Sequence, residues 1–387
     1  MAGAMVESAA VTSPRPGLTL LHDTDIAAGH HHRWTDTGGV VSLLVQDVLG
    51  ESRFGMAYCH RLLEVLDRQV KPNSVVPTVS SLPILACEAS GGDPCRAAPV
   101  AAAWRLVRLA AKLFDDVEDG EPNGQPAEAI NLATGLLFVA RLALNELAAR
   151  EIDLDLVRCL DRALNRAMLR ACAGQHGDLV ASQVGMASID PEAWLEIALA
   201  KSGELLAWAA WAGALVAGAD EHILACYRKY GSHLGVLLQV ADDFNGVWHP
   251  EGTSDLAAGR PTLPVCYGLS VAEARERDFL QALLEQAVEG DDAAEAQARQ
   301  LLVDLGAQAY LLVVGQVQRR QALEALRSAG CASPAGQQLV ALLDRVLPAL
   351  SADGTSVAAG PVLSAQEVSR WGGNSERCCP QATGGML

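Results

Sequence analysis

Long apolar segments of helical composition dominate the chain, and two of them carry closely spaced aspartates near their ends. The first cluster spans residues 115–119, and the second is the pair at 242–243. At about 3.6 residues per turn, the second pair shares a helical face with Gln239. The same periodicity places three carboxylates of the first cluster on one face: Asp115, Asp116 and Asp119. We therefore expect the fold to bring these two acidic helix faces close to each other.

Carboxylates crowded in this way repel one another unless a cation lies among them. Oxygen-only ligands suit a hard ion such as Mg²⁺, which keeps several waters and is usually completed by substrate phosphates. If the two helices face each other, Asp242 and Asp243 lie opposite the first cluster. The pattern therefore predicts a diphosphate held by Mg²⁺ between two helices. An acidic run is also common at a solvated helix end, so other features must decide.

Composition favours a single all-α body. Half of the 387 residues are hydrophobic, only 4% are aromatic, and Ala and Leu dominate the periodic segments. Neither strand-like alternation nor a fixed-period repeat is visible. We expect a single bundle of about ten helices with a site between facing helices. The predicted helical segments are 38–70, 79–90, 97–119, 127–150, 154–181, 190–218, 221–247, 262–288, 292–305, 307–328 and 334–350.

The ends of the chain differ from its middle in composition. Residues 1–37 and 351–387 are rich in small and polar residues with little periodicity, so they are predicted to be mobile tails. The functional domain is then predicted to span residues 38–350.

Charge and apolar length bear on partners and location. The net charge of −17 disfavours nucleic acid or an anionic membrane surface as a partner. We take residues 205–219 as the most apolar run, and about fifteen residues fall short of a bilayer span, so stable membrane insertion is not expected. The first residues show no secretory pattern, and the ten cysteines lack metal-type spacing. We therefore expect a cytoplasmic protein.

Three further segments place polar groups where an apolar helix would otherwise continue. Gln175 lies in the run Gly-Gln-His-Gly-Asp-Leu, and Lys201 interrupts a strongly apolar stretch. A lone lysine there is costly to bury without an anionic partner. Arg260 lies in the sequence run of residues 254–264, which closely follows the second aspartate pair.

Taken in order, these segments resemble the trans-isoprenyl diphosphate synthases, the polyprenyl synthetase family, over residues 80–270. The shared motifs are the first aspartate-rich run, Gly-Gln-x-x-Asp-Leu, Lys-Ser, Gln-x-x-Asp-Asp and Asp-Leu-x-x-Gly-Arg-x-Thr-Leu-Pro. The resemblance implies an isoprenoid synthase fold with a central metal-lined pocket. It also implies about two or three Mg²⁺ ions, an allylic prenyl diphosphate as substrate, and a homodimer as an assembly.

Carried over residue by residue, the resemblance implies roles for particular side chains. The implied metal ligands are Asp115, Asp116, Asp119, Asp242 and Asp243. The implied diphosphate contacts are Gln175, Lys201, Gln239 and Arg260. The expected catalytic residues are Asp115, Asp116, Lys201, Asp242 and Asp243.

The helix that carries the first motif also bears on chain length. Ala110 and Ala111 lie about one turn before Asp115, where the resembling family places bulky aromatics that stop a prenyl chain. Two alanines leave this floor open and predict longer substrates. The alternative is that Val107 or Trp104 supplies the floor.

The chain departs from the family at several places. Gly246 stands where the second motif ordinarily closes with an aspartate, so restoring an acid there is expected to tighten metal binding. Residues 72–95 and 120–140 contain neither Lys nor Arg, and Val107 stands where the family usually has a histidine. Each charge-assisted hydrogen bond contributes on the order of 1.5–3 kcal/mol, so isopentenyl diphosphate should bind weakly.

These departures lead to an expected function with two alternatives. We expect a Mg²⁺-dependent enzyme that ionises an allylic diphosphate of about C15–C20 or longer and releases pyrophosphate. It would be a terpene synthase, or a transferase that prenylates an acceptor other than isopentenyl diphosphate. One alternative is a conventional polyprenyl diphosphate synthase of geranylgeranyl type, with Lys71, Arg105 or Arg108 in the vacant basic roles. The other is a non-catalytic subunit of a heteromeric prenyl synthase.

Overall fold

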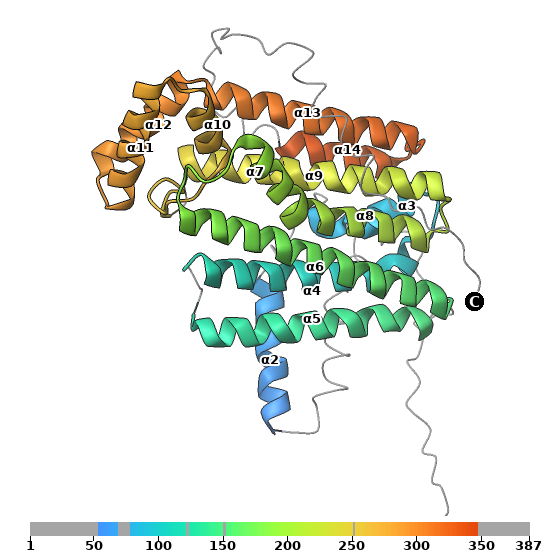
Figure 1. Ribbon diagram of the computed structural model, residues 1–387. Helices are drawn as coiled ribbons and strands as arrows, with labels where there is room; N and C mark the ends of the chain where they lie inside the picture. The colour runs from blue at the N-terminus through green and yellow to red at the C-terminus, as the bar shows by residue number, and fades with distance from the viewer. Residues whose placement is uncertain (1–52, 69–77, 121–123, 150–151, 251, 347–387) are drawn as a thin grey trace, which may run out of the picture. The chain divides into compact units, whose positions relative to one another are not determined.

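The computed structural model describes residues 53–68, 78–120, 124–149, 152–250 and 252–346. All of them belong to the second of the two units into which the chain divides, Thr37–Leu387. The predicted tails, 1–37 and 351–387, lie outside the described residues, so the domain boundaries remain predictions. Within the described ranges the chain is helical and contains no strand (Figure 1), which confirms the predicted all-α class.

The described α-helices are shown in Figure 1. They are α2 (Arg53–Arg68), α3 (Leu82–Ala89), α4 (Ala98–Glu118), α5 (Pro126–Ala149), α6 (Leu154–Val184), α7 (Pro191–Ala198), α8 (Glu204–Val216), α9 (Glu221–Trp248), α10 (Leu263–Val271), α11 (Ala274–Val288), α12 (Asp292–Asp304), α13 (Ala307–Ser328) and α14 (Pro334–Val346). Short helical turns are η1 (Val79–Ser81), η2 (Pro94–Ala97) and the π-helical turn η3 (Leu199–Gly203).

Three helices, α4, α6 and α9, position the acidic motifs. Helix α4 packs against α5 and α8, α6 against α8 and η3, and α9 against α8, α13 and η3. Helix α8 lies at the centre of this arrangement and is buried along most of its length. The three motif helices are therefore held around a common apolar core.

The local sequence explains where α4 begins and ends. Pro99 lies in its first turn, where a missing N–H costs nothing. The chain leaves the helix through Gly120, whose φ of 75° favours glycine. The aspartates of residues 115–119 thus fall at the carboxyl end of the helix, where the macrodipole disfavours negative charge. Their position therefore does not favour the stability of the helix.

Two features of the helices differ from the prediction. The segment predicted as one helix over 262–288 breaks at Ala272, because Glu273 and Glu276 form a capping box that starts α11. The segment predicted as one helix over 190–218 contains the π-helical turn η3. A π turn inserts one residue into the helical repeat, and such turns frequently occur at functional sites.

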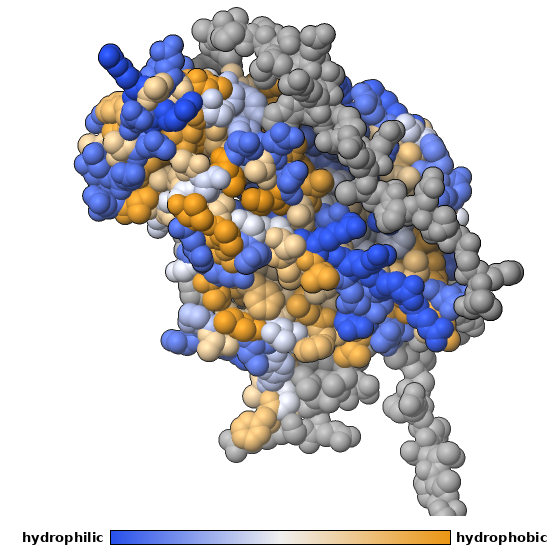
Figure 2. All heavy atoms as spheres, viewed as in Figure 1, coloured by the Kyte–Doolittle hydropathy of each residue, from blue (hydrophilic) through white to orange (hydrophobic). Residues whose placement is uncertain are grey.

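One apolar helix is longer than the run identified from sequence. By length and composition, residues Pro126–Ala148 of α5 could cross a membrane, although 44% of the most apolar stretch is buried in the protein. Helices α12 and α13, which are bent relative to each other, meet the same criterion when they are taken together. Phe138 of α5 is 64% exposed. Figure 2 shows apolar side chains where α5 lies, and hydrophilic ones over the N-terminal half of α6. Core helices of soluble proteins pass the same test, so the absence of membrane insertion stays a prediction.

Candidate active site

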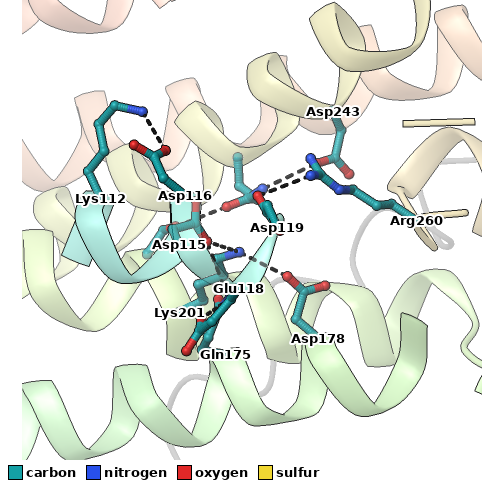
Figure 3. Close-up of polar contacts among 12 residues, drawn as sticks. Lys112, Asp115, Asp116, Glu118, Asp119, Gln175, Asp178, Lys201, Asp243 and Arg260 are labelled. Atoms are coloured by element: carbon teal, nitrogen blue, oxygen red, sulfur yellow. Dashed lines mark hydrogen bonds and ion pairs between the residues drawn. The ribbon is translucent and has the colours of Figure 1, made fainter. Parts of the chain in front are cut away.

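The motif helices surround a pocket of about 1190 Å³. Asp115 and Asp119 reach it from α4, Gln175 from α6, and Asp242 from α9. Lys201 reaches it from η3. Figure 3 shows Asp115, Asp119, Gln175 and Lys201 close together between the helices. Distant sequence motifs are therefore brought together at one site, as the acidic pattern predicted.

Lys201 bridges two of the three helices. Its Nζ lies 3.2 Å from Asp115 Oδ1 and 2.9 Å from Asp178 Oδ2 (Figure 3). Burial alone would lower the pKa of Lys201, but the charges of Asp115 and Asp178 outweigh it and raise the pKa above its usual value. The lysine therefore stays protonated and supplies a fixed positive charge in the pocket.

Arg260 makes a second bridge, from the loop after α9 to α4. Its Nη2 lies 3.1 Å from Asp119 Oδ2, and its Nη1 lies 3.1 Å from Asp255 Oδ1. Burial and the charge of Asp115 raise the pKa of Asp119 to about 6, although Arg260 and Lys201 counteract this rise. The two protein cations thus neutralise the acidic walls only in part.

The two aspartates of α9 have different surroundings. Asp242 opens into the pocket, and enclosure by its walls together with the charge of Asp115 raises its pKa to about 6. Asp243 is only 4% exposed and accepts hydrogen bonds from Leu263 N at 2.7 Å and Gln239 Nε2 at 3.2 Å. Both oxygens of Asp243 are therefore engaged within the protein. These contacts suit a residue that fixes the start of α10 beside the pocket, which differs from the direct metal coordination predicted for Asp243 from the sequence.

Gln239 links this wall to η3. Its side-chain oxygen accepts a hydrogen bond of 3.0 Å from Ser202 Oγ, next to Lys201, while its nitrogen donates to Asp243. Gln175 donates from α6 to Glu118 at 2.7 Å and to Asp115 at 3.3 Å. Both glutamines predicted from the sequence therefore lie at the site. Gln175 contacts carboxylates of α4, and Gln239 contacts Asp243 and the turn η3 that carries Lys201.

The approach of α6 to η3 depends on glycine. A Cβ atom at Gly174 would lie 2.5 Å from Lys201 N and 2.9 Å from Ala200 C, both backbone atoms. Contacts under 3.0 Å of this kind cannot be relieved by turning a side chain. Gly174 therefore lets η3 lie directly against α6, which brings Lys201 within reach of Asp178.

Besides Asp243, three sequence predictions need correction at this site. Asp116 does not line the pocket but pairs with Lys112 Nζ at 2.9 Å (Figure 3). Ala110 is fully buried in the core, so of the two alanines only Ala111 lines the pocket. Val107 is also buried away from the pocket wall. Side chains of adjacent helical residues differ in direction by about 100°. Helical periodicity over a whole turn therefore identifies the face but not which of its residues point into the pocket.

The structure also adds residues that the sequence analysis did not assign. Asp178, Asp255 and Lys112 line the pocket, together with Arg108, which the sequence had offered for a vacant basic role. Asp178 belongs to the Gly-Gln-x-x-Asp-Leu motif and was the easiest to find. Trp104 lies on the pocket wall, which agrees with the alternative floor, and its Nε1 donates to Val79 O at 2.8 Å.

The donor chemistry of the site fits Mg²⁺ brought in with a phosphate ligand. Among the described residues, no three His, Cys, Asp or Glu side chains converge as a ready-made metal cage. Carboxylates nonetheless face the pocket from α4, α6 and α9, and Mg²⁺ usually takes only one or two of them and keeps waters and substrate phosphates. Asp115, Asp119 and Asp242 are the residues best placed to hold it.

The raised pKa values predict how stability depends on pH without a metal. The folded-state pKa values of Asp119, Asp242 and Asp243 are about 6, 6 and 8, above the ordinary value for aspartate. The folded state therefore binds protons more tightly than the unfolded state, and stability falls as pH rises from about 4 to about 8. Urea unfolding of metal-free protein should give a lower free energy of unfolding at pH 8 than at pH 5. Asp243→Asn should make the free energy of unfolding less dependent on pH. An equally steep pH dependence in this variant would contradict the raised pKa of Asp243.

The wall of the pocket beside Asp115 predicts chain length. Replacing Ala111 by phenylalanine should shorten the preferred product or substrate, because the new ring fills the wall about one turn from the acidic cluster. Product lengths measured by mass spectrometry for wild type and Ala111→Phe test this. Unchanged lengths would show that the chain runs along another wall.

The fold and the site define a class: an all-α protein whose acidic helices line a common pocket, in which Lys201 and Arg260 pair with the carboxylates. The family model described as polyprenyl synthetase matches residues 79–302. The chain belongs to the polyprenyl synthetase family, as the motif resemblance predicted.

Relatives and solved structures agree with this membership. A short chain isoprenyl diphosphate synthase of Methanothermobacter thermautotrophicus is 29% identical over 64% of this chain and 78% of its own. A geranylgeranyl diphosphate synthase of Mycobacterium tuberculosis is 30% identical over 66% of this chain and 73% of its own. The crystal structure of a polyprenyl synthetase from Streptomyces coelicolor matches with a TM-score of 0.63 at 24% identity, over 81% of this chain and 99% of that one. That likeness supports the isoprenoid synthase fold.

Proposed function

We propose that this protein is a polyprenyl diphosphate synthase that condenses an allylic diphosphate with isopentenyl diphosphate and releases pyrophosphate. The names of its relatives support this conventional activity, which the sequence analysis held as an alternative, over a terpene synthase. The observation that carries the proposal is Arg108, because it offers a second anionic group a cation within the same pocket.

Arg108 lies on the pocket wall about two turns before Asp115, or about 10 Å along α4. Its Nη1 donates to Ser80 Oγ at 2.8 Å, and its Cζ lies 5.8 Å from the centre of the Trp104 ring. Enclosure by the pocket walls, and then the charge of Arg105, lower the pKa of Arg108 from its ordinary value. No carboxylate among the described residues forms an ion pair with Arg108 within 4.0 Å. A guanidinium that has no carboxylate partner in the described part of the chain and that lies on a pocket wall is suited to a ligand's phosphate.

Two anion positions can then be assigned along the pocket. Lys201 and Arg260 lie with Asp115 and Asp119 at one position, where they would bind the allylic diphosphate. Arg108, aided by Lys112 one turn away, would hold the isopentenyl diphosphate at the other. This arrangement compensates for the absence of basic residues that made the second substrate doubtful from sequence.

Each part of the site then has a role. Asp115, Asp119 and Asp242 would hold Mg²⁺, which when bound neutralises the diphosphate and draws electron density from its bond to carbon. Lys201 and Arg260 would bind the phosphate oxygens as the leaving group gains charge. Leucines that line the pocket, such as Leu179, Leu205 and Leu238, offer the prenyl chain an apolar wall that excludes water.

The proposal predicts that pyrophosphate release requires isopentenyl diphosphate. Release from C10, C15 and C20 allylic diphosphates should be measured with Mg²⁺, each with and without isopentenyl diphosphate. Arg108→Ala should raise the KM for isopentenyl diphosphate by about tenfold or more, since a charge-assisted hydrogen bond contributes roughly 1.5–3 kcal/mol. The matched control is Arg105→Ala on the same helix, because Arg105 does not line the pocket. Rapid release without isopentenyl diphosphate would instead support a terpene synthase.

A further inference from the structure

The loop after α9 makes its closest approach to the helix at Gly246. A Cβ atom at Gly246 would overlap Asp255 Oδ2 and would lie 2.5 Å from Asp255 Cγ and 3.1 Å from Oδ1. The backbone N–H of Asp255 donates to Gly246 O at 3.1 Å. The carboxylate of Asp255 therefore occupies the space that a side chain at position 246 would need.

Position 246 is the next position on the acidic face of α9. It lies four residues, or about one turn, after Asp242, and Gly246 itself lines the pocket. The side chain of Asp255 is 11% exposed and lines the same pocket. Burial and Asp115 raise the pKa of Asp242 most, and Asp255 raises it further, as expected for a carboxylate nearby. The acidic face that stops at Gly246 along the helix is thus continued by a residue from the loop.

We propose that Asp255 supplies the third carboxylate of the second wall and helps to hold the metal ion that accompanies the allylic diphosphate. The proposal rests on the metal and diphosphate site of the proposed function, and not on the use of isopentenyl diphosphate. Gly246 is required because only a residue without Cβ leaves room for this carboxylate. The expectation that an acid at Gly246 would simply tighten metal binding is corrected accordingly.

The loop is built to keep Asp255 in place. Arg260 N donates to Asp255 O at 2.9 Å, and Arg260 Nη1 donates to Asp255 Oδ1 at 3.1 Å. Helix α12 contacts both the loop and the end of α9, because Ser254 Oγ donates to Glu295 at 2.7 Å and Arg299 Nε donates to Val247 O of α9 at 2.7 Å. The position of the carboxylate is therefore set by tertiary contacts on both sides of Asp255.

Moving the carboxylate back onto the helix tests the proposal. The dissociation constant of inorganic pyrophosphate with Mg²⁺ would be measured by calorimetry on the full chain for wild type, Gly246→Asp, Asp255→Gly and the double variant. Loss of Asp255 should weaken binding about 10- to 100-fold, as for supporting residues of metal sites. Gly246→Asp alone should also weaken binding, because its side chain displaces Asp255. The double variant should bind more tightly than either single variant, and failure of this recovery would overturn the proposal.

Two further variants separate a metal role from a structural one. Asp255→Asn keeps the shape and an oxygen for Arg260, but it should still weaken Mg²⁺-dependent pyrophosphate binding because it lacks the charge. Ser254→Ala removes the bond to Glu295 but no carboxylate, so it should lower Tm and weaken that binding less than Asp255→Asn does. Unchanged binding in Asp255→Asn would overturn the proposal. Normal pyrophosphate binding without condensation would instead contradict only the proposed use of isopentenyl diphosphate.

Discussion

Alanine in place of Asp115 is expected to reduce kcat/KM for pyrophosphate release by about 10³-fold or more, since it removes electrostatic support where charge develops. Asp115 Oδ1 lies 3.2 Å from Lys201 Nζ and 3.3 Å from Gln175 Nε2. The substitution therefore removes a proposed metal ligand and also leaves Lys201 with one carboxylate fewer. Rates should be measured over a range of Mg²⁺ concentrations, so that weak metal binding is distinguished from slow chemistry.

Asp116→Ala is the matched control for Asp115→Ala. Asp116 points to Lys112 on the same helix, and partly exposed ion pairs of this type contribute about 0.2–1 kcal/mol. The loss of activity should therefore be less than about tenfold. Equal losses in the two variants would restore Asp116 as a metal ligand. Near-native turnover in Asp115→Ala would show that Asp115 does not hold the metal.

The second large effect is expected from Gly174→Ala. The added methyl group would press against the backbone of η3 at Lys201 and Ala200. Overpacking of this kind costs about 1–3 kcal/mol, and here the strain falls on the turn that carries Lys201. We expect a lower free energy of unfolding together with a large loss of activity. Urea unfolding and pyrophosphate release measure the two effects separately.

Gly177→Ala provides a control one turn along α6. A Cβ atom at Gly177 would lie 3.4 Å from Ile197 Cγ1, which is a side-chain contact that can adjust. Replacing glycine by alanine inside a helix otherwise stabilises by roughly 0.5–1 kcal/mol. Gly177→Ala should thus be neutral or slightly stabilising and retain activity. If Gly174→Ala behaved in the same way, the close approach of α6 and η3 would not matter for Lys201.

Much of the fold follows from local sequence. Helices such as α4 and α9 are long, periodic and ended by clear breaks, so their existence and approximate bounds were predictable. The break before α11 was missed because its capping box begins with Glu273, a less usual first residue than Ser or Thr. The π-helical turn η3 is set by packing against α6 and α9 and has no local sequence signal.

The site was predictable to the level of the helix face, but not of the single residue. Asp115, Asp119, Lys201 and Arg260 lie together as expected. Neighbours such as Asp116 and Ala110 were included because a face argument spans several residues of a turn. The place of Asp255 could not be read from spacing, since it depends on how a loop packs on a glycine. The part of the site that could not be predicted depends on contacts between segments that are distant in the sequence.

Because Lys201 and Arg260 are already paired with carboxylates, ligand binding at this site must exchange these ion pairs for new ones. Lys201 and Arg260 already pair with the carboxylates that would hold the metal, and the same two side chains would bind the diphosphate. A metal ion arriving alone must compete with both cations, and a diphosphate arriving alone must compete with the carboxylates. When both bind, the metal pairs with the carboxylates and the diphosphate pairs with Lys201 and Arg260, so no charged group is left without a partner of opposite charge. Mg²⁺ and pyrophosphate should therefore bind with positive cooperativity, and by thermodynamic linkage each should raise the affinity for the other by the same factor.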